Sequence, residues 1–256
     1  MSELDQQAIL SINRSGWDKV AQRFYGGLAL PQYGPLAQTE ETLGLLGQLS
    51  EKRGLEIGCG SGHSLAYLAA HGAAELWGID LSPVQIDLAR SYLAEQEISA
   101  QLFVSPMEAN PGLPTDYFDL VVSIYALGWS TDLAATFSLI HGYLKSGGVL
   151  IFSWEHPAYS RLEYENGQYA IKRSYHAENP ALHPAWNGVE IVLHERKLST
   201  FINAVIGAGL QIEQLVEPEF EPTLANDNNQ SPERWYSVPR AQLMPTTFIV
   251  KARKPL

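Results

Sequence analysis

The sequence predicts an α/β fold with a doubly wound, mostly parallel sheet. Three observations lead to this prediction. A short apolar strand over residues 55–57 enters a glycine-rich turn, and a helix follows at once. Strand-like and helix-like stretches then alternate along the chain. The nearly continuous apolar run Phe118–Tyr125 is typical of a central parallel strand that is buried on both faces.

Composition and charge narrow the class of protein. The chain has 256 residues, of which 45% are hydrophobic, as in a globular protein with a sizeable core. A net charge of -11 argues against a broad nucleic-acid-binding face. Cys59 is the single cysteine, so no internal disulfide can form, and we infer a reducing compartment. Neither a signal peptide nor a long apolar run occurs, so we expect a cytoplasmic protein that does not enter a membrane.

Residues 1–50 precede the first strand. Apolar residues recur at helical spacing in the first half, which predicts one or two short amphipathic helices, and Glu40–Leu49 is expected to form another. This leader is rich in aromatic residues, including Trp17 and Tyr25. It either covers an edge of the sheet or forms a lid over bound ligands.

The glycine-rich turn has the pattern acid-x-G-x-G-x-G, formed by Glu56, Gly58, Gly60 and Gly62. Bare backbone next to a helix N-terminus can hold a ligand, although such a turn can also serve strand–helix packing alone. A dinucleotide fingerprint would need glycine at position 63, which is His63, and there is no P-loop. A carboxylate at position 56 would oppose a pyrophosphate but could attract a cation.

Asp80 ends the second expected strand, Glu75–Asp80. It lies 22 residues after Gly58, close to the interval at which an acid meets ribose hydroxyls in doubly wound folds. Ser82 and the proline after it supply a helix cap and a first helical residue. Asp80 therefore either binds a ribose or belongs only to that cap.

Three further segments complete the expected parallel part of the sheet. Ala100–Val104, Phe118–Tyr125 and Val149–Trp154 are the third, fourth and fifth strands, with a helix over 132–144 before the last of them. Open α/β sheets place ligands at the carboxyl ends of their strands, so Tyr125 and Trp129 are expected near the chemistry.

The glycine loop, Asp80 and the Leu-Lys-x-Gly-Gly turn at 144–148 together resemble the class I S-adenosylmethionine-dependent methyltransferases. The resemblance covers residues 50–155 and, more loosely, 197–253. It implies a Rossmann-like sheet of seven strands, closed by an antiparallel last strand. It also implies S-adenosylmethionine as cofactor and S-adenosylhomocysteine as product. A lid over the site is then favoured, because methyl transfer needs water excluded from the sulfonium.

The resemblance and the motifs give a set of expected site residues. Cofactor contacts are expected from Trp17, Tyr25, Glu56, Gly58, Cys59, Gly60, Gly62, Asp80, Leu81, Met107, Glu108, Ser123 and Tyr125. Substrate contacts are expected from Trp129, Trp154 and His156. Cys59 is expected to be a small residue tolerated in the turn and not a reactive thiol. No histidine spacing typical of a metal site occurs, so no metal is expected.

Some roles stay open. The aspartate that usually follows the third strand is replaced here by Ser105 or Pro106, so Glu108 either accepts from the adenine amino group or is solvated. His156 and Tyr125 are the candidates for a general base at the carboxyl edge. The alternative for His156 is a histidine that is hydrogen-bonded in the turn before Pro157.

We expect one domain over residues 1–256. Its parts are an N-terminal helical lid (1–50), a cofactor-binding core (50–155), an insertion that covers the substrate or is a plain surface excursion (156–196), and a C-terminal helix with a β-hairpin (197–256). In the insertion, strand-like alternation occurs only at Val189–Leu193. The predicted function is methyl transfer to a small molecule at oxygen, nitrogen or carbon. The alternatives are an NAD(P)-type oxidoreductase and a non-catalytic protein that binds S-adenosylmethionine; oligomeric state is left open.

Overall fold

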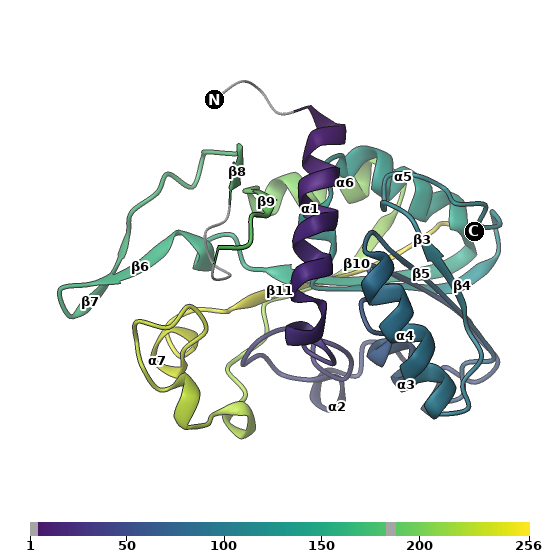
Figure 1. Ribbon diagram of the computed structural model, residues 1–256, viewed down its shortest axis with the longest axis horizontal. Coiled ribbons are helices and arrows are strands. Elements are labelled where there is room, and N and C mark those ends of the chain that lie inside the picture. Colours follow the sequence, from purple (N-terminus) through teal and green to yellow (C-terminus); the bar gives the residue numbers. More distant parts are fainter. Residues whose placement is uncertain (1–4, 183–187) are drawn as a thin grey trace.

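A computed structural model describes residues 5–182 and 188–256 and shows one central seven-stranded sheet (Figure 1). The strand order is β10-β11-β5-β4-β1-β2-β3. The strands are β1 Arg53–Ile57, β2 Glu75–Asp80, β3 Gln101–Val104, β4 Phe118–Ile124, β5 Leu144–Glu155, β10 Gln211–Val216 and β11 Thr247–Arg253. β11 pairs antiparallel with both β5 and β10, and the other pairings are parallel. The predicted sheet with an antiparallel last strand is confirmed.

Four helices cover the two faces of the sheet. They are α3 His63–Ala70, α4 Pro83–Glu95, α5 Leu133–Tyr143 and α6 Leu198–Gly207. α3 and α4 pack with part of the leader on one face, where their leucines and isoleucines meet Leu120, Val122 and Ile151. α5 and α6 pack on the other face, where Phe137 and Phe201 contact Phe152. The central strands are therefore buried on both sides, as their apolar sequence requires.

The leader forms α1 Gln6–Val20, which continues into the short 3-10 helix η1 Ala21–Phe24. α1 runs across the front of the molecule, beside β9 and α4 (Figure 1). The helix expected over Glu40–Leu49 is wrong in length, because α2 covers only Glu40–Leu43. It ends where Gly44 takes a left-handed conformation, with φ of 58°.

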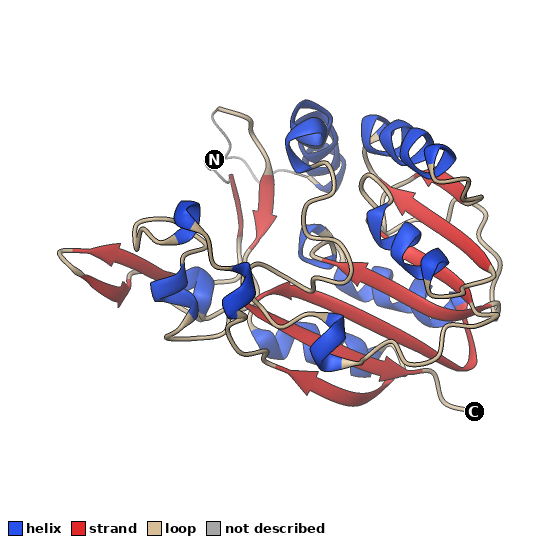
Figure 2. Ribbon diagram, turned by 90° about the horizontal axis from the view of Figure 1, so that it is seen from below, coloured by secondary structure: helices blue, strands red, loops and turns tan. Residues whose placement is uncertain are grey.

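The insertion contains more strand than its sequence pattern predicted. β6 Leu162–Glu165 and β7 Gln168–Ile171 form a hairpin that projects away from the sheet in both views (Figures 1 and 2). Its turn is Asn166-Gly167, a pair that favours a two-residue hairpin turn because both residues have positive φ. β8 Pro180–Leu182 pairs with β9 Val192–His194, and the expected Val189–Leu193 strand overlaps only β9. Part of this insertion, residues 183–187, lies outside the described residues.

The segment between β10 and β11 is mostly irregular and packs against the leader. It contains two 3-10 turns, η4 Pro222–Leu224 and η5 Asp227–Asn229, and the short helix α7 Val238–Ala241. Leu36 of the leader is buried against Val238 and Ala241, and its carbonyl accepts the backbone N–H of Glu221 at 2.9 Å. Over the described residues, no helix is long and apolar enough to cross a membrane.

Candidate active site

The candidate site lies at the edge where the carboxyl ends of the parallel strands meet. β1 lies between β2 and β4, and the connections from β1 and β4 leave the sheet toward opposite faces. A crevice opens in such sheets at the point where the strand order reverses. The loops after β1, β2, β4 and β5 supply the predicted residues.

The glycine loop exposes its backbone because three of its residues have left-handed conformations. The φ angles of Gly58, Gly60 and Gly62 are 73°, 49° and 82°, a region that side chains rarely adopt. A Cβ at Gly58 would lie 2.3 Å from that of Ala126, so the loop approaches the end of β4 closely. At Gly60 the nearest atom to such a Cβ is 3.9 Å away. A ligand can therefore lie against the main chain at Gly60.

Two carboxylates flank this loop, one on the buried residue Glu56 and one on the half-buried residue Asp80. Glu56 on β1 is 2% exposed, and its Oε2 has no hydrogen-bond partner among the described residues. Burial, together with the nearby charge of Asp80, raises the pKa of Glu56 to about 8. Burial likewise raises the pKa of Asp80 to about 6, against the backbone hydrogen bonds that lower it. A cation between these groups would relieve the cost of ionising them, whereas a phosphate would add to it.

Asp80 takes part in the turn after β2 without being its helix cap. Its Oδ2 accepts from the Gly60 N–H and its Oδ1 from the Ser82 N–H, both at 2.9 Å. Ser82 is the residue that caps α4, through the N–H of Gln85. Ser82 Oγ also donates to Asp18 of α1 at 2.5 Å, which ties the leader to this corner of the site.

The loop after β3 holds Glu108 in place. Its Oε1 accepts from the N–H and the hydroxyl of Thr131, while its Oε2 is buried with no partner in the described chain. Glu108 is therefore not the solvated residue of the alternative prediction. Met107 packs against the core beside it.

Five aromatic side chains at the candidate site form a continuous row, which we call the aromatic row: Trp17, Trp129, Trp154, Tyr125 and Tyr236. Successive ring centroids are 5.4, 5.4, 5.3 and 6.4 Å apart. The row joins α1, the loop after β4, β5 and the segment before α7. Tyr125 has a φ of 54°, a strained conformation of the kind that clusters at functional sites.

Glu155, at the end of β5, forms a hydrogen bond with Tyr236, the last residue of this row. It is buried, and its Oε2 accepts from the Tyr236 hydroxyl at 2.6 Å and from the Trp235 Nε1–H at 2.5 Å. Burial raises its pKa. The sequence analysis missed Glu155 and Tyr236, although Glu155 directly precedes His156 at the expected ligand edge. Nothing in the sequence pairs it with a tyrosine 81 positions later.

His156 does not have a free ring nitrogen. Its Nδ1 accepts the N–H of Ala158 at 3.2 Å, and its Nε2 lies 2.8 Å from an oxygen of Glu217. Burial lowers its pKa, so the neutral ring donates through Nε2. This geometry is that of the alternative, a histidine that is hydrogen-bonded in the turn before Pro157.

The remaining expected contacts lie at different depths. Ser123 is fully buried, and its hydroxyl donates to the Ile57 carbonyl at 2.8 Å, so it joins β4 to β1 beneath the loop. Cys59 is buried against β2 near Gly78, and burial raises the pKa of its thiol. Leu81 is the half-buried residue between Asp80 and the cap of α4. Tyr25 contacts His63 of α3 and Tyr92 of α4.

Contacts with the insertion and with Trp129 hold α1 in place. The side chain of Asn13 donates to the Val192 carbonyl at 3.0 Å and accepts its N–H at 2.7 Å. A Cβ at Gly16 would lie 2.7 Å from the Glu190 carbonyl, so only glycine allows this approach to the insertion. This contact and that of Trp17 with Trp129 hold α1 beside the insertion and the loop after β4.

No group of three or more potential metal-ligating side chains occurs in the described part of the chain.

Known methyltransferases resemble this chain in sequence and in structure. Residues 55–152 match the family model described as a methyltransferase domain. An uncharacterised protein of Haemophilus influenzae is 33% identical over 187 residues, which cover 69% of this chain and 74% of that protein.

Two named relatives match over shorter stretches. A malonyl-[acyl-carrier protein] O-methyltransferase of Acetivibrio thermocellus is 32% identical over 46% of this chain, and a ubiquinone biosynthesis O-methyltransferase of Nitrosomonas europaea is 32% identical over 43%. The chain spans less than half of their lengths, 42% and 46%. A solved structure of an S-adenosylmethionine-dependent methyltransferase of Mesorhizobium loti is 28% identical, with a TM-score of 0.67 over 83% of this chain and 95% of that chain.

Proposed function

The chain belongs to the class I S-adenosylmethionine-dependent methyltransferase family, and on that premise we propose that it transfers a methyl group from S-adenosylmethionine to a small-molecule acceptor. One observation carries the proposal: the buried carboxylate of Glu56 and the half-buried carboxylate of Asp80 flank the open backbone at Gly60. This arrangement of two carboxylates beside open backbone suits a cationic nucleoside that has no phosphate.

The residues present fit this cofactor. S-adenosylmethionine has an α-ammonium group, a sulfonium and a ribose. The unpartnered Oε2 of Glu56 offers an acceptor to a cationic donor, and both oxygens of Asp80 retain lone pairs for ribose hydroxyls. The unpartnered Oε2 of Glu108 would accept from the adenine amino group. When bound, the cofactor supplies an electrophilic methyl group and leaves as S-adenosylhomocysteine.

The chain's own contribution is mainly alignment and exclusion of water. The aromatic row and α1 close the mouth of the site, with Tyr125 positioned at the end of β4. Proximity and orientation of this kind can supply about 7–11 kcal/mol of the barrier. Where the acceptor loses a proton, the Tyr236 hydroxyl can take it as its own proton passes to Glu155. This pair replaces His156 as the base.

A small acceptor is supported by the relatives and by charge. The names of the two O-methyltransferase relatives refer to a malonyl group on an acyl-carrier protein and to ubiquinone biosynthesis. The net charge of -11 favours such acceptors over nucleic acid. We further propose that the chain works as one domain in the cytoplasm, with the insertion covering the acceptor.

The test uses methyl-tritiated S-adenosylmethionine and a pool of small metabolites. We expect label to enter a small-molecule fraction, and we expect Gly60→Ala to abolish both transfer and cofactor binding. Gly44→Ala is the matched control, because Gly44 has a similar φ of 58° but no atom within 4 Å of an added Cβ. Binding without transfer to any acceptor would support the non-catalytic alternative, and absence of binding to folded protein would overturn the proposal.

A further inference from the structure

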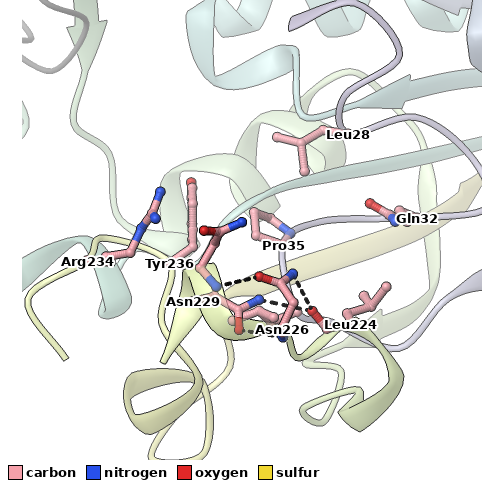
Figure 3. A pocket seen from close by; sticks show the side chains of 10 residues that line it. Leu28, Gln32, Pro35, Leu224, Asn226, Asn229, Arg234 and Tyr236 are labelled. Atoms are coloured by element: carbon pink, nitrogen blue, oxygen red, sulfur yellow. Dashed lines mark hydrogen bonds between the residues drawn. The ribbon is translucent and has the colours of Figure 1, made fainter. Parts of the chain in front are cut away.

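A cavity of about 420 Å³ opens between the leader and the segment before α7 (Figure 3). This volume lies in the range of small-molecule sites. Ten residues line it: Leu28, Gln32, Pro35, Leu36, Leu224, Asn226, Asn228, Asn229, Arg234 and Tyr236. None of them belongs to the glycine loop or to the strand ends that hold the cofactor candidates.

The walls of this cavity are fixed in place. Pro35 accepts from the Thr246 hydroxyl at 2.6 Å, and Leu36 accepts from the backbone of the facing segment. Asn226 and Asn229 hold the η5 turn through a reciprocal capping box. Leu28 and Leu36 have φ angles of 50° and 59°, and strained non-glycine residues of this kind cluster at ligand-binding sites.

The charge of the lining differs from that of the protein. The chain has 28 acidic and 17 basic residues, yet the cavity lining contains one cation, Arg234, and no carboxylate. The side chain of Arg234 makes no ion pair or hydrogen bond with any described residue, and neither do those of Gln32 and Asn228. Arg234 and Tyr236 extend in the same direction from their segment (Figure 3). A guanidinium with free donors binds carboxylate or phosphate in a two-point geometry.

Two connections join this cavity to the candidate active site. Tyr236 lines the cavity and also ends the aromatic row, 6.4 Å from the ring of Tyr125. Gly34, next to the lining residue Pro35, packs so closely on Tyr125 that an added Cβ would lie 2.8 Å from its ring. The negative charge of Glu155 behind Tyr236 is offset by Arg240 and Arg173. Tyr236 and the segment at Gly34–Pro35 therefore place this cavity next to Tyr125.

We propose that this cavity binds the anionic end of the methyl acceptor, with Arg234 as the recognition residue, so that the acceptor is a small molecule with a carboxylate or phosphate group. The assignment of the occupant as the acceptor rests on the proposed methyltransferase function. The anion site itself does not, so it can be tested without the cofactor.

The experiment is an NMR titration of isotope-labelled protein with malonate and, separately, with inorganic phosphate at constant ionic strength, without cofactor. We expect saturable shifts of residues 28–36 and 224–236, including Tyr236. Arg234→Ala should weaken binding about tenfold or more, because charge-assisted hydrogen bonds are lost. Asn228→Asp, which adds a carboxylate to the lining, should weaken it as well. Arg234→Lys should keep part of the affinity.

Arg90→Ala is the matched control, since Arg90 is an exposed arginine on α4 whose one ion pair among the described residues is with the exposed Asp87. It should bind both anions as the wild type does. Preference for malonate assigns a carboxylate to the acceptor, and preference for phosphate assigns a phosphate ester. Equal anion affinity in wild type and Arg234→Ala, or shifts confined to other parts of the molecule, overturns the site.

Calorimetry with S-adenosylhomocysteine on the same variants separates this proposal from the proposed function. Arg234→Ala should bind S-adenosylhomocysteine with wild-type affinity. Failure of the wild type to bind it would overturn the proposed function and leave the anion result standing.

Discussion

At the scale of single residues, the site depends on carboxylates placed where ionisation is unfavourable. Glu56 is buried and Asp80 is half-buried near it, and the structure supplies backbone donors to Asp80 but leaves one oxygen of Glu56 unpaired among the described residues. Such groups lower the stability of the protein alone and gain a partner when a cation binds. Stability and ligand affinity should therefore respond to Glu56 in opposite directions.

Replacing Glu56 with Gln should stabilise the unliganded protein at alkaline pH. The folded-state pKa of about 8 lies above the ordinary value of 4.5, so the folded protein holds a proton that the unfolded chain releases. The stability that protonated Glu56 contributes to the folded protein is then fully present below about pH 4.5 and is lost as pH rises toward 8. Urea unfolding should show Glu56→Gln to be about 1–3 kcal/mol more stable than wild type at pH 8.5, with little difference at pH 5. The same pH slope in both proteins would contradict the assignment.

Replacing Asp80 with Ala should weaken S-adenosylhomocysteine binding about ten- to a hundredfold. The expected loss is that of charge-assisted hydrogen bonds to ribose hydroxyls, about 1.5–3 kcal/mol. Isothermal titration calorimetry measures it directly. Asp87→Ala, which removes an exposed aspartate from α4, is the control and should bind normally. Unchanged affinity in Asp80→Ala would remove this residue from the cofactor site.

At the scale of elements, α1 is the part whose position depends most on a few contacts. It meets the insertion through Asn13 and Gly16, the aromatic row through Trp17, and the turn after β2 through Asp18. Asn13 provides two hydrogen bonds in a buried position, and its loss would leave both main-chain groups of Val192 unpaired. We expect this residue to decide how firmly α1 is held.

Asn13→Ala should cost about 1–3 kcal/mol of stability, because buried backbone groups lose their partners. Hydrogen–deuterium exchange should show faster exchange in α1 and β9, with the central strands unchanged. Gln6→Ala serves as the comparison, since the hydrogen bond of Gln6 to Thr131 is exposed. If α1 exchanges equally in the two variants, the Asn13 contact does not hold α1 in place.

At the scale of the whole molecule, the fold was predictable wherever neighbouring residues in sequence set the structure. The glycine loop, Asp80 with its cap and the apolar run of β4 are local signals, and each lies where the sequence analysis expected it. The partners of Glu155 and His156 lie 81 and 61 positions away along the chain. No periodicity or spacing encodes such pairs, so neither contact could be predicted from the sequence.

Binding of S-adenosylhomocysteine should stabilise the entire protein. At a free concentration of one hundred times Kd, the gain is about 2.7 kcal/mol. For a chain of 256 residues this corresponds to a rise in Tm of about 5–10 °C, measured by calorimetric scanning. NAD at the same concentration should leave Tm unchanged. A larger rise with NAD would argue for the oxidoreductase alternative.

The hydrogen bond between Asn13 and Val192, which lie 179 positions apart, also affects the order in which the chain folds during its synthesis. The ribosome releases α1 long before the segment that anchors it exists, so this helix must wait, unattached, while the core assembles. Contacts between distant parts of a chain slow folding, because the entropy of closing a long loop is lost before the contacts can stabilise the structure. The region around α1 should accordingly be the last part of a newly made molecule to reach its final structure.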